Sequence, residues 1–463
     1  MKKILLLFFG FLCIFAANAA QVANVEYVHT LIEQEWDISI PYNSALSDVH
    51  TVANMKYLLT AIDVANEILN GEKTTNYGNG EFATLQVADT IATNQAVETL
   101  IEKEEKYKFF VTIDQNLFPM GRKSFFGFEI SAAGTFYIDW GDGTEETIVK
   151  NNTDKVEYLH DYGTKDAVYT IKIGGRATMY LQDYSAIHFG GGSGFTSSDD
   201  NAKIISQIDG SLGKIFRTLP DGSQPTFMST FDHASNLKTI PAGLFSGIYG
   251  APVSNMFNHT FAWCHNLTSI PARLFSGISG APAKNMFLGT FSDCLSLTSI
   301  PDGLFAGISG APASYMFSGT FQGCSKLTSI PAGLFVGISG APAESMFNST
   351  FSGCSGLTGA IPDGLFGNLT GAPASNMFLG TFQDCSKLTS IPENLFGNIS
   401  GTAQDYMFKN TFYNCTSLTG TSARINGQYL YEIWPDANSD QVGGMYKNAT
   451  GLSDYSNIPS AWK

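Results

Sequence analysis

The sequence has few charged residues for its length of 463 residues. Asp, Glu, Lys and Arg make up only 14% of the chain, and the 41 acidic residues outnumber the 26 basic ones. Nucleic acids and anionic membrane surfaces repel negative charge, so this balance argues against both as partners. The abundance of Gly (47) and Phe (35) argues against a disordered acidic chain and indicates an ordered, stacked one.

Sequence motifs typical of enzymes are missing as well. The seven His are scattered, and we find no phosphate-binding loop, no Gly-x-Ser-x-Gly segment and no helical metal-binding His pair. We therefore expect a protein that is not an enzyme and that uses no cofactor. The alternative of an unrecognised hydrolase would require a polar cluster that interrupts the repeats described below.

Long apolar runs are confined to the N-terminus. Lys2 and Lys3 precede an apolar run from Ile4 to Ala17, and Ala17-Asn18-Ala19 offers the small residues that a signal peptidase accepts. Residues 1–19 are thus predicted to be a cleaved signal peptide, and the mature protein is expected to be secreted or held at the cell surface. No later segment approaches the ~18 apolar residues of a membrane span.

Residues 20–105 form a mixed region with helical periodicity, clearest from Val52 to Leu69. A packing or linker role and an oligomerisation or anchoring role both remain open for it.

From residue 106 to 185 the apolar period changes to two, as at Phe126, Phe128 and Ile130, which predicts a small antiparallel β domain. The Gly141-Asp142-Gly143 step is expected to be a turn, because Asp bonds its own downstream backbone and Gly accepts positive φ. Three segments of this region resemble the polycystic-kidney-disease (PKD) domain, an immunoglobulin-like β-sandwich of exported bacterial proteins. They are Trp140-Gly141-Asp142-Gly143, His160-Asp161-Tyr162 and Tyr169-Thr170-Ile171. The resemblance implies a spacer or adhesion module.

A weak calcium-site candidate lies in this region, since Asp139, Asp142 and Glu145 could offer several oxygen ligands from one loop. Their spacing fits no defined calcium loop, and turn chemistry on a solvated acidic face is the favoured interpretation. His160 is expected to be a hydrogen-bonded structural residue rather than a ligand.

Residues 226–463 consist of copies of one unit. Residues 186–225 are predicted to be a linker that joins these copies to the β domain. Met-Phe pairs recur at intervals of 30 residues from Met256-Phe257 to Met346-Phe347, and again at Met377-Phe378 and Met407-Phe408. In the unit that begins near Lys284, apolar residues at helical spacing predict a short helix to Cys294, and Leu297 to Ile300 predicts a strand. The expected fold is multidomain, with a C-terminal leucine-rich-repeat-type α/β solenoid whose end copies are degenerate. The core of one unit is predicted to contain Phe291, Cys294, Leu297, Ile300, Pro301, Leu304 and Phe305.

Cysteines occur at one equivalent position in each repeat, from Cys264 to Cys415, and the outer copies carry Ala234 and Ala449 there. Exported cysteines commonly form disulfides, but a position that also accepts Ala favours buried free thiols that act as small apolar groups. A zinc site is less favoured, because the short Cys-x-x-Cys spacing is missing.

The pattern Phe291-x-x-Cys294-x-x-Leu297-x-x-Ile300-Pro301 resembles the leucine-rich repeats of the BspA-like surface-protein family and covers about half of the chain. The resemblance implies a bacterial surface protein that adheres to a host or to other microbes. We expect an adhesin-like protein that binds extracellular proteins or glycans; the alternative is a structural component of a matrix or surface layer that assembles with itself. Positions that vary between copies are the predicted binding surface: Trp263, His265, Tyr315, Glu344, Tyr406 and Lys409. Thr-Ser pairs such as Thr298-Ser299 could form a second, hydroxyl-bearing surface or could simply be exposed strand residues.

Overall fold

The computed structural model describes residues 76–77, 80–81, 106–117, 125–163, 167–182, 184–189 and 199–463. The chain divides into two compact units, Met1–Lys106 and Tyr107–Lys463. In the first unit, strand β1 (Asn76–Tyr77) pairs antiparallel with β2 (Gly80–Glu81). The predicted signal peptide and the predicted helices of residues 20–105 lie outside the described residues.

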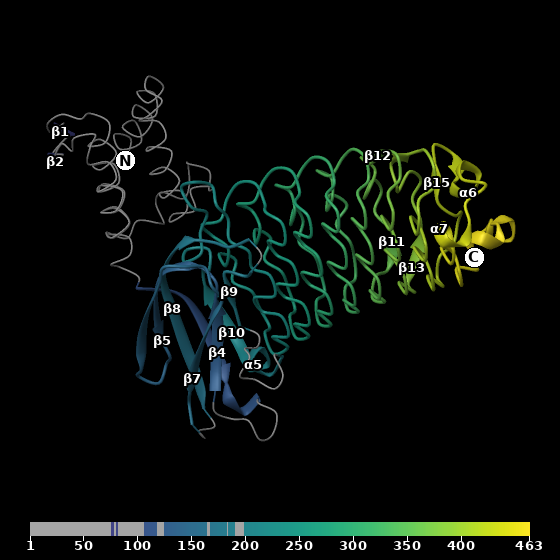
Figure 1. Cartoon of the computed structure of the whole chain (residues 1–463). Coiled ribbons are helices and arrows are strands. Elements are labelled where there is room, and N and C mark those ends of the chain that lie inside the picture. The colour runs from purple at the N-terminus through teal and green to yellow at the C-terminus, as the bar shows by residue number, and fades with distance from the viewer. Residues whose placement is uncertain are drawn as a thin grey trace. The chain divides into compact units, whose positions relative to one another are not determined.

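The second unit begins with two antiparallel sheets (Figure 1). One has the strand order β10-β3-β8-β5-β6 and the other has the order β7-β4-β9. The five strands of the larger sheet are β3 (Tyr107–Asp114), β5 (Ala133–Asp139), β6 (Glu145–Lys150), β8 (Val168–Met179) and β10 (Ile205–Gly210). The smaller sheet contains β4 (Phe125–Ile130), β7 (Val156–Asp161) and β9 (Ile187–His188). Two short helices, η3 (Gln115–Leu117) and α5 (Asp199–Lys203), flank these strands.

Alternating apolar residues bury one side of each sheet in a shared core. Phe109, Val111 and Ile113 of β3 are fully buried, and Phe128 of β4 stacks on Trp140 with ring centroids 5.5 Å apart. The predicted turn at Gly141-Asp142-Gly143 is confirmed: Asp142 Oδ1 accepts a hydrogen bond from the Thr144 backbone at 3.0 Å, and Gly141 and Gly143 have φ values of 82° and 95°.

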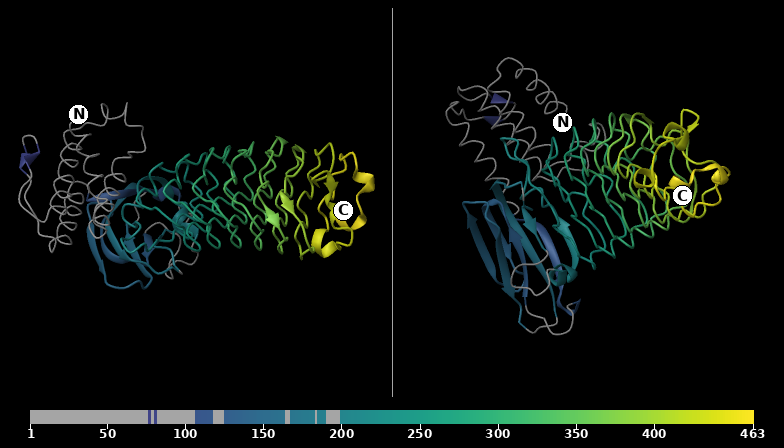
Figure 2. Two further views of the ribbon diagram at one scale, coloured as in Figure 1. Left: turned by 90° about the horizontal axis from the view of Figure 1, so that it is seen from above. Right: turned by 45° about the vertical axis from the view of Figure 1, so that its right-hand side comes forward.

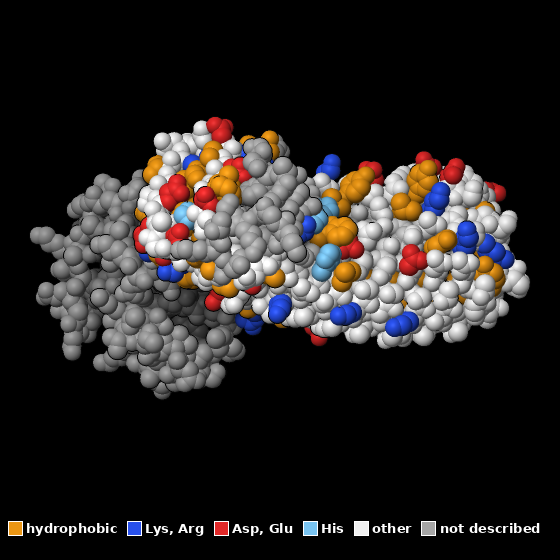
Figure 3. Space-filling view, turned by 90° about the horizontal axis from the view of Figure 1, so that it is seen from below, with side chains coloured by type: hydrophobic (Ala, Val, Ile, Leu, Met, Phe, Trp, Pro, Cys, Tyr) orange, Lys and Arg blue, Asp and Glu red, His pale blue; other side chains and the backbone are white. Residues whose placement is uncertain are grey.

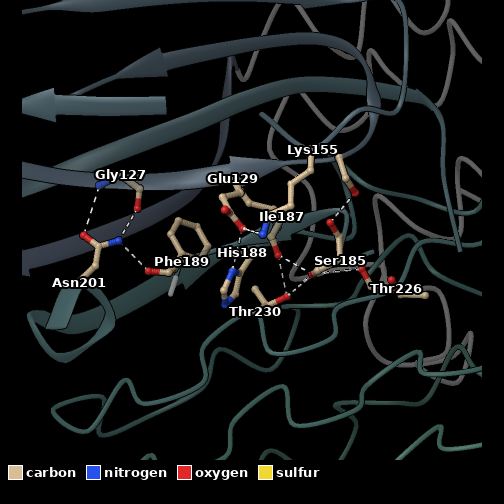
Figure 4. Close-up of polar contacts among 11 residues, drawn as sticks. Gly127, Glu129, Lys155, Ser185, Ile187, His188, Phe189, Asn201, Thr226 and Thr230 are labelled. Carbon is tan, nitrogen blue, oxygen red and sulfur yellow. Dashed lines mark hydrogen bonds and ion pairs between the residues drawn. The ribbon is translucent and has the colours of Figure 1, made fainter. Parts of the chain in front are cut away.

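Strand β9 connects this β domain to the first repeat without a break in hydrogen bonding (Figure 4). The Phe189 N–H donates to the Thr230 carbonyl at 3.0 Å, and the Phe189 ring stacks on Phe231 at 5.3 Å. Thr230 Oγ1 donates to the Ile187 carbonyl at 2.9 Å, as Thr260 Oγ1 does to the Phe227 carbonyl at 2.7 Å one repeat later. The segment 185–189 therefore hydrogen-bonds to the first repeat as each repeat does to the next. Strand β10 lies in the same predicted linker of residues 186–225 and pairs with β3.

The repeats themselves stack side by side as turn-rich coils (Figures 1 and 2). Alternate backbone N–H groups point to different partners. Phe287 and Phe291 donate to the Met316 and Thr320 carbonyls of the next repeat at 2.9 Å each. Thr290 instead donates to the Phe287 carbonyl three residues earlier, at 3.2 Å. Each repeat is thus held by hydrogen bonds within itself and, at every second residue, to its neighbour.

The predicted fold class, a leucine-rich-repeat-type α/β solenoid, is wrong. Residues 226–429, all of which the structure describes, contain no α-helix, and the regular secondary structure of the second unit is mainly strands in small separate sheets. The predicted helix from Lys284 to Cys294 is replaced by turns. The predicted strand of each repeat is formed only by β11 (Gly359–Ala360) and β13 (Leu388–Ser390), which pair in parallel.

Positive φ angles explain why the helix does not form. Asn285, Gly289 and Asp293 have φ values of 57°, 59° and 55°, and the matching residues of the other repeats are also left-handed. A right-handed helix cannot contain such a residue at every fourth position. The turns nevertheless keep a period of four, so Phe287 and Phe291 lie on the same side, as they would on a helix.

The remaining elements are short. Isolated parallel bridges join successive repeats, as between Gly280 and Ile308. Strand β12 (Thr370–Gly371) pairs in parallel with β14 (Asn398–Ile399). The last residues form β15 (Arg424–Ile425), β16 (Gln428–Tyr429), α6 (Leu430–Ile433), α7 (Ser439–Val442), η4 (Tyr455–Asn457) and η5 (Ser460–Trp462). Tyr446 stacks on Phe412 at 5.9 Å, and Trp462, which is 1% exposed, stacks on Tyr446 at 6.4 Å. These larger rings cover the C-terminal end of the Phe column.

Candidate functional site

The left-handed residues lie on one surface of the repeats, which we call the turn face. It consists of residues 284–285, 288–289 and 292–293 and the matching residues of the other repeats. Between these pairs, the side chains of 286–287 and 290–291 point into the core and are 0% exposed. The four-residue turn thus alternates two inward residues with two at the surface, although some of the surface residues, such as Gly289 and Ser292, are themselves buried.

Five of the six predicted binding residues lie on the turn face, and the sixth, His265, follows Trp263 by two residues. The structure brings them together in pairs rather than in one cluster. Trp263 contacts His265 edge to face, with centroids 5.8 Å apart. Tyr315 Oη donates to Glu344 Oε1 at 3.0 Å, and Lys409 Nζ lies 4.7 Å from the Tyr406 ring centroid.

The Trp263 site is the most aromatic part of the turn face. The Trp263 indole is 43% exposed, and the His233 ring of the preceding repeat lies parallel to it at 5.5 Å with an interplanar angle of 2°. His259 lies on the turn face four residues before Trp263 and hydrogen-bonds to Asn258. Burial lowers the pKa of His259, so its imidazole is neutral at pH 7. Figure 3 shows His and hydrophobic side chains next to one another on the surface of the repeats, with a few Lys, Arg, Asp and Glu side chains nearby.

Asn side chains hydrogen-bond to one another on the turn face. Asn285 Nδ2 donates to Asn255 Oδ1 across the repeat boundary at 2.9 Å, and Asn258 Nδ2 donates to the same oxygen at 3.2 Å. Asn414 and Asp384 form a similar pair at 2.7 Å further along the stack. The turn face therefore presents amide and carboxylate groups at regular intervals.

Aromatic residues at left-handed positions are energetically costly. Trp263, Tyr315 and Tyr406 have φ values of 58°, 59° and 57°. This conformation costs about 1–2 kcal/mol for most L-residues, and Gly and Asn are the residues that adopt it readily. At the matching positions of other repeats Gly, Asn and Asp predominate: Asn255, Asn285, Ser345 and Asn376 match the two Tyr, and His233, Asp293, Gly323, Gly353, Asp384, Asn414 and Asn448 match Trp263. Backbone strain of this type clusters at functional sites.

The sequence interpretation missed His233, His259 and Asp293 as members of this surface. It assigned the residues of the turn face to a helix edge, so the stacking of His233 on Trp263 was not expected. The recurrence of Gly, Asn or Asp at every fourth position, as at Asn285, Gly289 and Asp293, was the available signal.

The hydroxyl-bearing surface is also present. Thr298 and Ser299 are exposed, and Thr298 Oγ1 lies 3.4 Å from the Thr268 carbonyl, at the long limit of a hydrogen bond. Thr328 and Thr358 repeat this contact. These hydroxyls contact the neighbouring backbone, in agreement with exposed structural residues.

The predicted repeat core is confirmed for six of its seven residues, which are buried: Phe291, Cys294, Leu297, Ile300, Leu304 and Phe305. Pro301 is only half-buried. Six cysteines, Cys264, Cys294, Cys324, Cys354, Cys385 and Cys415, are free and buried, as predicted. Each thiol donates to a Phe carbonyl of the preceding repeat, for example Cys294 Sγ to Phe261 at 3.3 Å. Burial raises their pKa values, to about 12 for Cys415, so the thiols stay protonated.

The candidate calcium ligands already have partners. Asp139 accepts from the Gly141 backbone at 2.9 Å and from Lys172 Nζ at 2.8 Å. Asp142 accepts from Thr144 and from His160 Nε2 at 2.8 Å, and Glu145 begins β6. Among the residues that the structure describes, no group of three or more His, Cys, Asp or Glu side chains could hold a metal ion. His160 is hydrogen-bonded, as expected, and stacks on Trp140 at 4.9 Å.

No protein-family description, no curated protein and no solved structure matches the chain. Within the described part of the chain, no helix has the length and hydrophobicity needed to cross a membrane.

Proposed function

We propose that this chain is an exported, non-catalytic binding protein that presents the turn face of its repeats to extracellular proteins or glycans. The observation that carries the proposal is the set of aromatic side chains at left-handed positions. A residue such as Trp263 adds strain where Asn or Gly would fit, and its ring remains 43% exposed. Exposed aromatic residues are the usual anchors of binding surfaces.

Other residues cover the apolar core at both ends of the stack. This favours binding of a partner along the side of the stack over end-to-end assembly. The Phe column of the repeats meets Phe189 and Phe109 of the β domain at one end. Tyr446 and Trp462 cover it at the other. Stacked repeats need such caps to remain soluble. The resemblance to PKD domains and to BspA-like surface proteins agrees with an adhesin-like role, and the predicted signal peptide with a secreted or cell-surface location.

Binding of the full mature chain to matrix proteins, glycans and whole cells tests the proposal. We expect saturable binding to at least one of these, weakened when Trp263, Tyr315 and Tyr406 are all replaced by Asn. Sedimentation velocity over a range of concentrations tests the self-assembling alternative. A chain that binds nothing and associates as its concentration rises would refute the proposal.

A further inference from the structure

Trp263 is far more exposed than the other tryptophans among the described residues. Trp140, Trp434 and Trp462 are at most 5% exposed, whereas Trp263 is 43% exposed. His233 supports one side of the indole at 5.5 Å. The matching residue of the next repeat is Asp293, and Gly323 and Gly353 follow it, so no aromatic ring continues the stack on the other side. The indole is therefore a flat, supported and accessible ring.

The polar groups around Trp263 can recognise hydroxyl groups. His259 lies on the turn face four residues before Trp263, and Asp293 occupies the position that matches Trp263 in the next repeat. Asn258 is 9% exposed and hydrogen-bonds to the His259 ring, so it positions His259 rather than facing a ligand. An imidazole both donates and accepts hydrogen bonds, and a carboxylate accepts two or more. The negative face of an aromatic ring attracts polarised C–H groups. A pyranose ring, which has C–H groups on its face and hydroxyls on its rim, matches both features.

The regular spacing of equivalent positions on the turn face indicates that its ligand is a polymer. Left-handed outward positions recur in every repeat, with Asn pairs at some boundaries and further aromatic residues at Tyr315 and Tyr406. A ligand that repeats along its length can contact several equivalent positions at once, and each added contact raises its affinity. A net charge of −15 disfavours a polyanion. Figure 3 shows scattered charged side chains of both signs on the repeats rather than a patch of one sign, in agreement with a neutral ligand.

We propose that the turn face binds a neutral polysaccharide, with one pyranose ring stacked on Trp263 and its hydroxyls hydrogen-bonded to His259 and Asp293. This inference rests on the proposed binding function and specifies its ligand class. A protein partner is the competing occupant, and the experiment below separates the two.

The test uses the full mature chain and four neutral polysaccharides: laminarin, hydroxyethylcellulose, galactomannan and pullulan. Affinity electrophoresis in gels containing each polymer measures binding. Tryptophan fluorescence during titration with oligosaccharides of two and six units from the retarding polymer then measures length dependence. We expect retardation by at least one polymer and tighter binding of the hexasaccharide than of the disaccharide. Trp263→Asn should weaken binding by roughly tenfold, the loss expected for one stacked ring.

Two variants make the result specific. Asn is a residue that the chain itself has at the matching Asn414, so Trp263→Asn should keep the fold and the unfolding temperature. Val336→Ser is the matched control, because Val336 is an exposed apolar residue of the repeats outside the turn face and Ser276 is its counterpart. This control should bind like the unsubstituted chain.

Cell binding gives the outcomes that would overturn the inference. Binding to cells that is lost after protease treatment and kept after periodate oxidation would identify a protein partner; it would refute the polysaccharide and leave the binding function standing. Retardation equal in Trp263→Asn and in the unsubstituted chain would also refute the assigned site. No binding to any polymer, matrix protein or cell would refute both proposals together.

Discussion

The β domain and the repeat stack bury aromatic residues in one continuous core, but their backbones are organised by different rules. In the β domain, each strand has its own partner and register, so contacts such as Phe128 on Trp140 occur once. In the stack, the same contact recurs: Phe291 lies 5.6 Å from Phe261 and 5.7 Å from Phe321. The comparison shows that a repeated local turn can replace regular secondary structure when every neighbour offers the same hydrogen bonds.

The largest expected effect comes from opening the Phe column in the middle of the stack. Phe321 is 0% exposed and stacks on Phe291 and on Phe351, at 5.7 Å in each case. Phe321→Ala should lower the free energy of unfolding by about 3–5 kcal/mol, since it leaves a cavity between two rings. Chemical denaturation followed by circular dichroism measures the change. The control Val336→Ser should change it by less than about 0.5 kcal/mol, and similar values for both variants would contradict a packed column.

Two glycine substitutions compare backbone strain in the two regions. A Cβ on Gly175 of β8, where φ is 94°, would lie 2.1 Å from the Thr135 carbonyl oxygen. Gly175→Ala should therefore disrupt the pairing of β5 with β8 and cost about 3 kcal/mol. Gly289→Asn in the stack should cost less than about 1 kcal/mol, because Asn adopts φ near 59° and the nearest atoms belong to the movable His259 ring.

Thermal unfolding of both variants measures this difference. If Gly289→Asn lowered the unfolding temperature as much as Gly175→Ala, the left-handed positions of the stack would accept only Gly. We do not expect this result, because Asn410 occupies the matching position of another repeat.

Protonation of the Asp142 carboxylate at low pH should destabilise the β domain. Burial raises the pKa of Asp142, but hydrogen bonds from Thr144 and His160 outweigh it and bring the pKa to about 2. Because the unfolded pKa is about 3.9, the ionised group stabilises the fold above pH 4, and this stabilisation disappears as the pH falls from about 4 to 2. We expect a loss of about 1–2 kcal/mol in that window.

Denaturation at pH 7, 4 and 2.5 measures this loss, with Asp142→Asn as the comparison. The variant should be less stable than the unsubstituted chain at pH 7 and approach it at pH 2.5. A constant difference across the range would show that Asp142 acts by something other than its charge.

The smallest effect is expected for the cysteine column. Cys324 is fully buried, and its thiol donates to the Phe291 carbonyl at 3.2 Å. Cys324→Ala should cost about 1 kcal/mol, because Ala234 and Ala449 already occupy the matching positions of the outer copies. A thiol reagent should find no reactive cysteine in the folded mature chain and six after denaturation. Reaction without denaturant, or fewer than six thiols after it, would contradict the buried free thiols.

Sequence reasoning identified the repeat unit, most of its core and part of the surface that we propose for binding. The Met-Phe pairs and the Cys column are buried as expected, since burial depends on hydrophobic pattern alone. Trp263, Tyr315 and Tyr406 were identified because they differ between otherwise similar copies. The pairing of Trp263 with His233 was not identified, since it depends on which residues of adjacent repeats lie side by side.

The sequence by itself determined the 30-residue period, the inward residues of each repeat and the positions that vary between copies. The tertiary structure decided the backbone conformation, because apolar residues four apart lie on one side of a helix and on one side of successive four-residue turns alike. Hydrogen bonds such as that from Phe287 to Met316 join neighbouring repeats and favour the left-handed turns over a helix. Only the assembled stack offers those acceptors, so no single repeat specifies its own conformation.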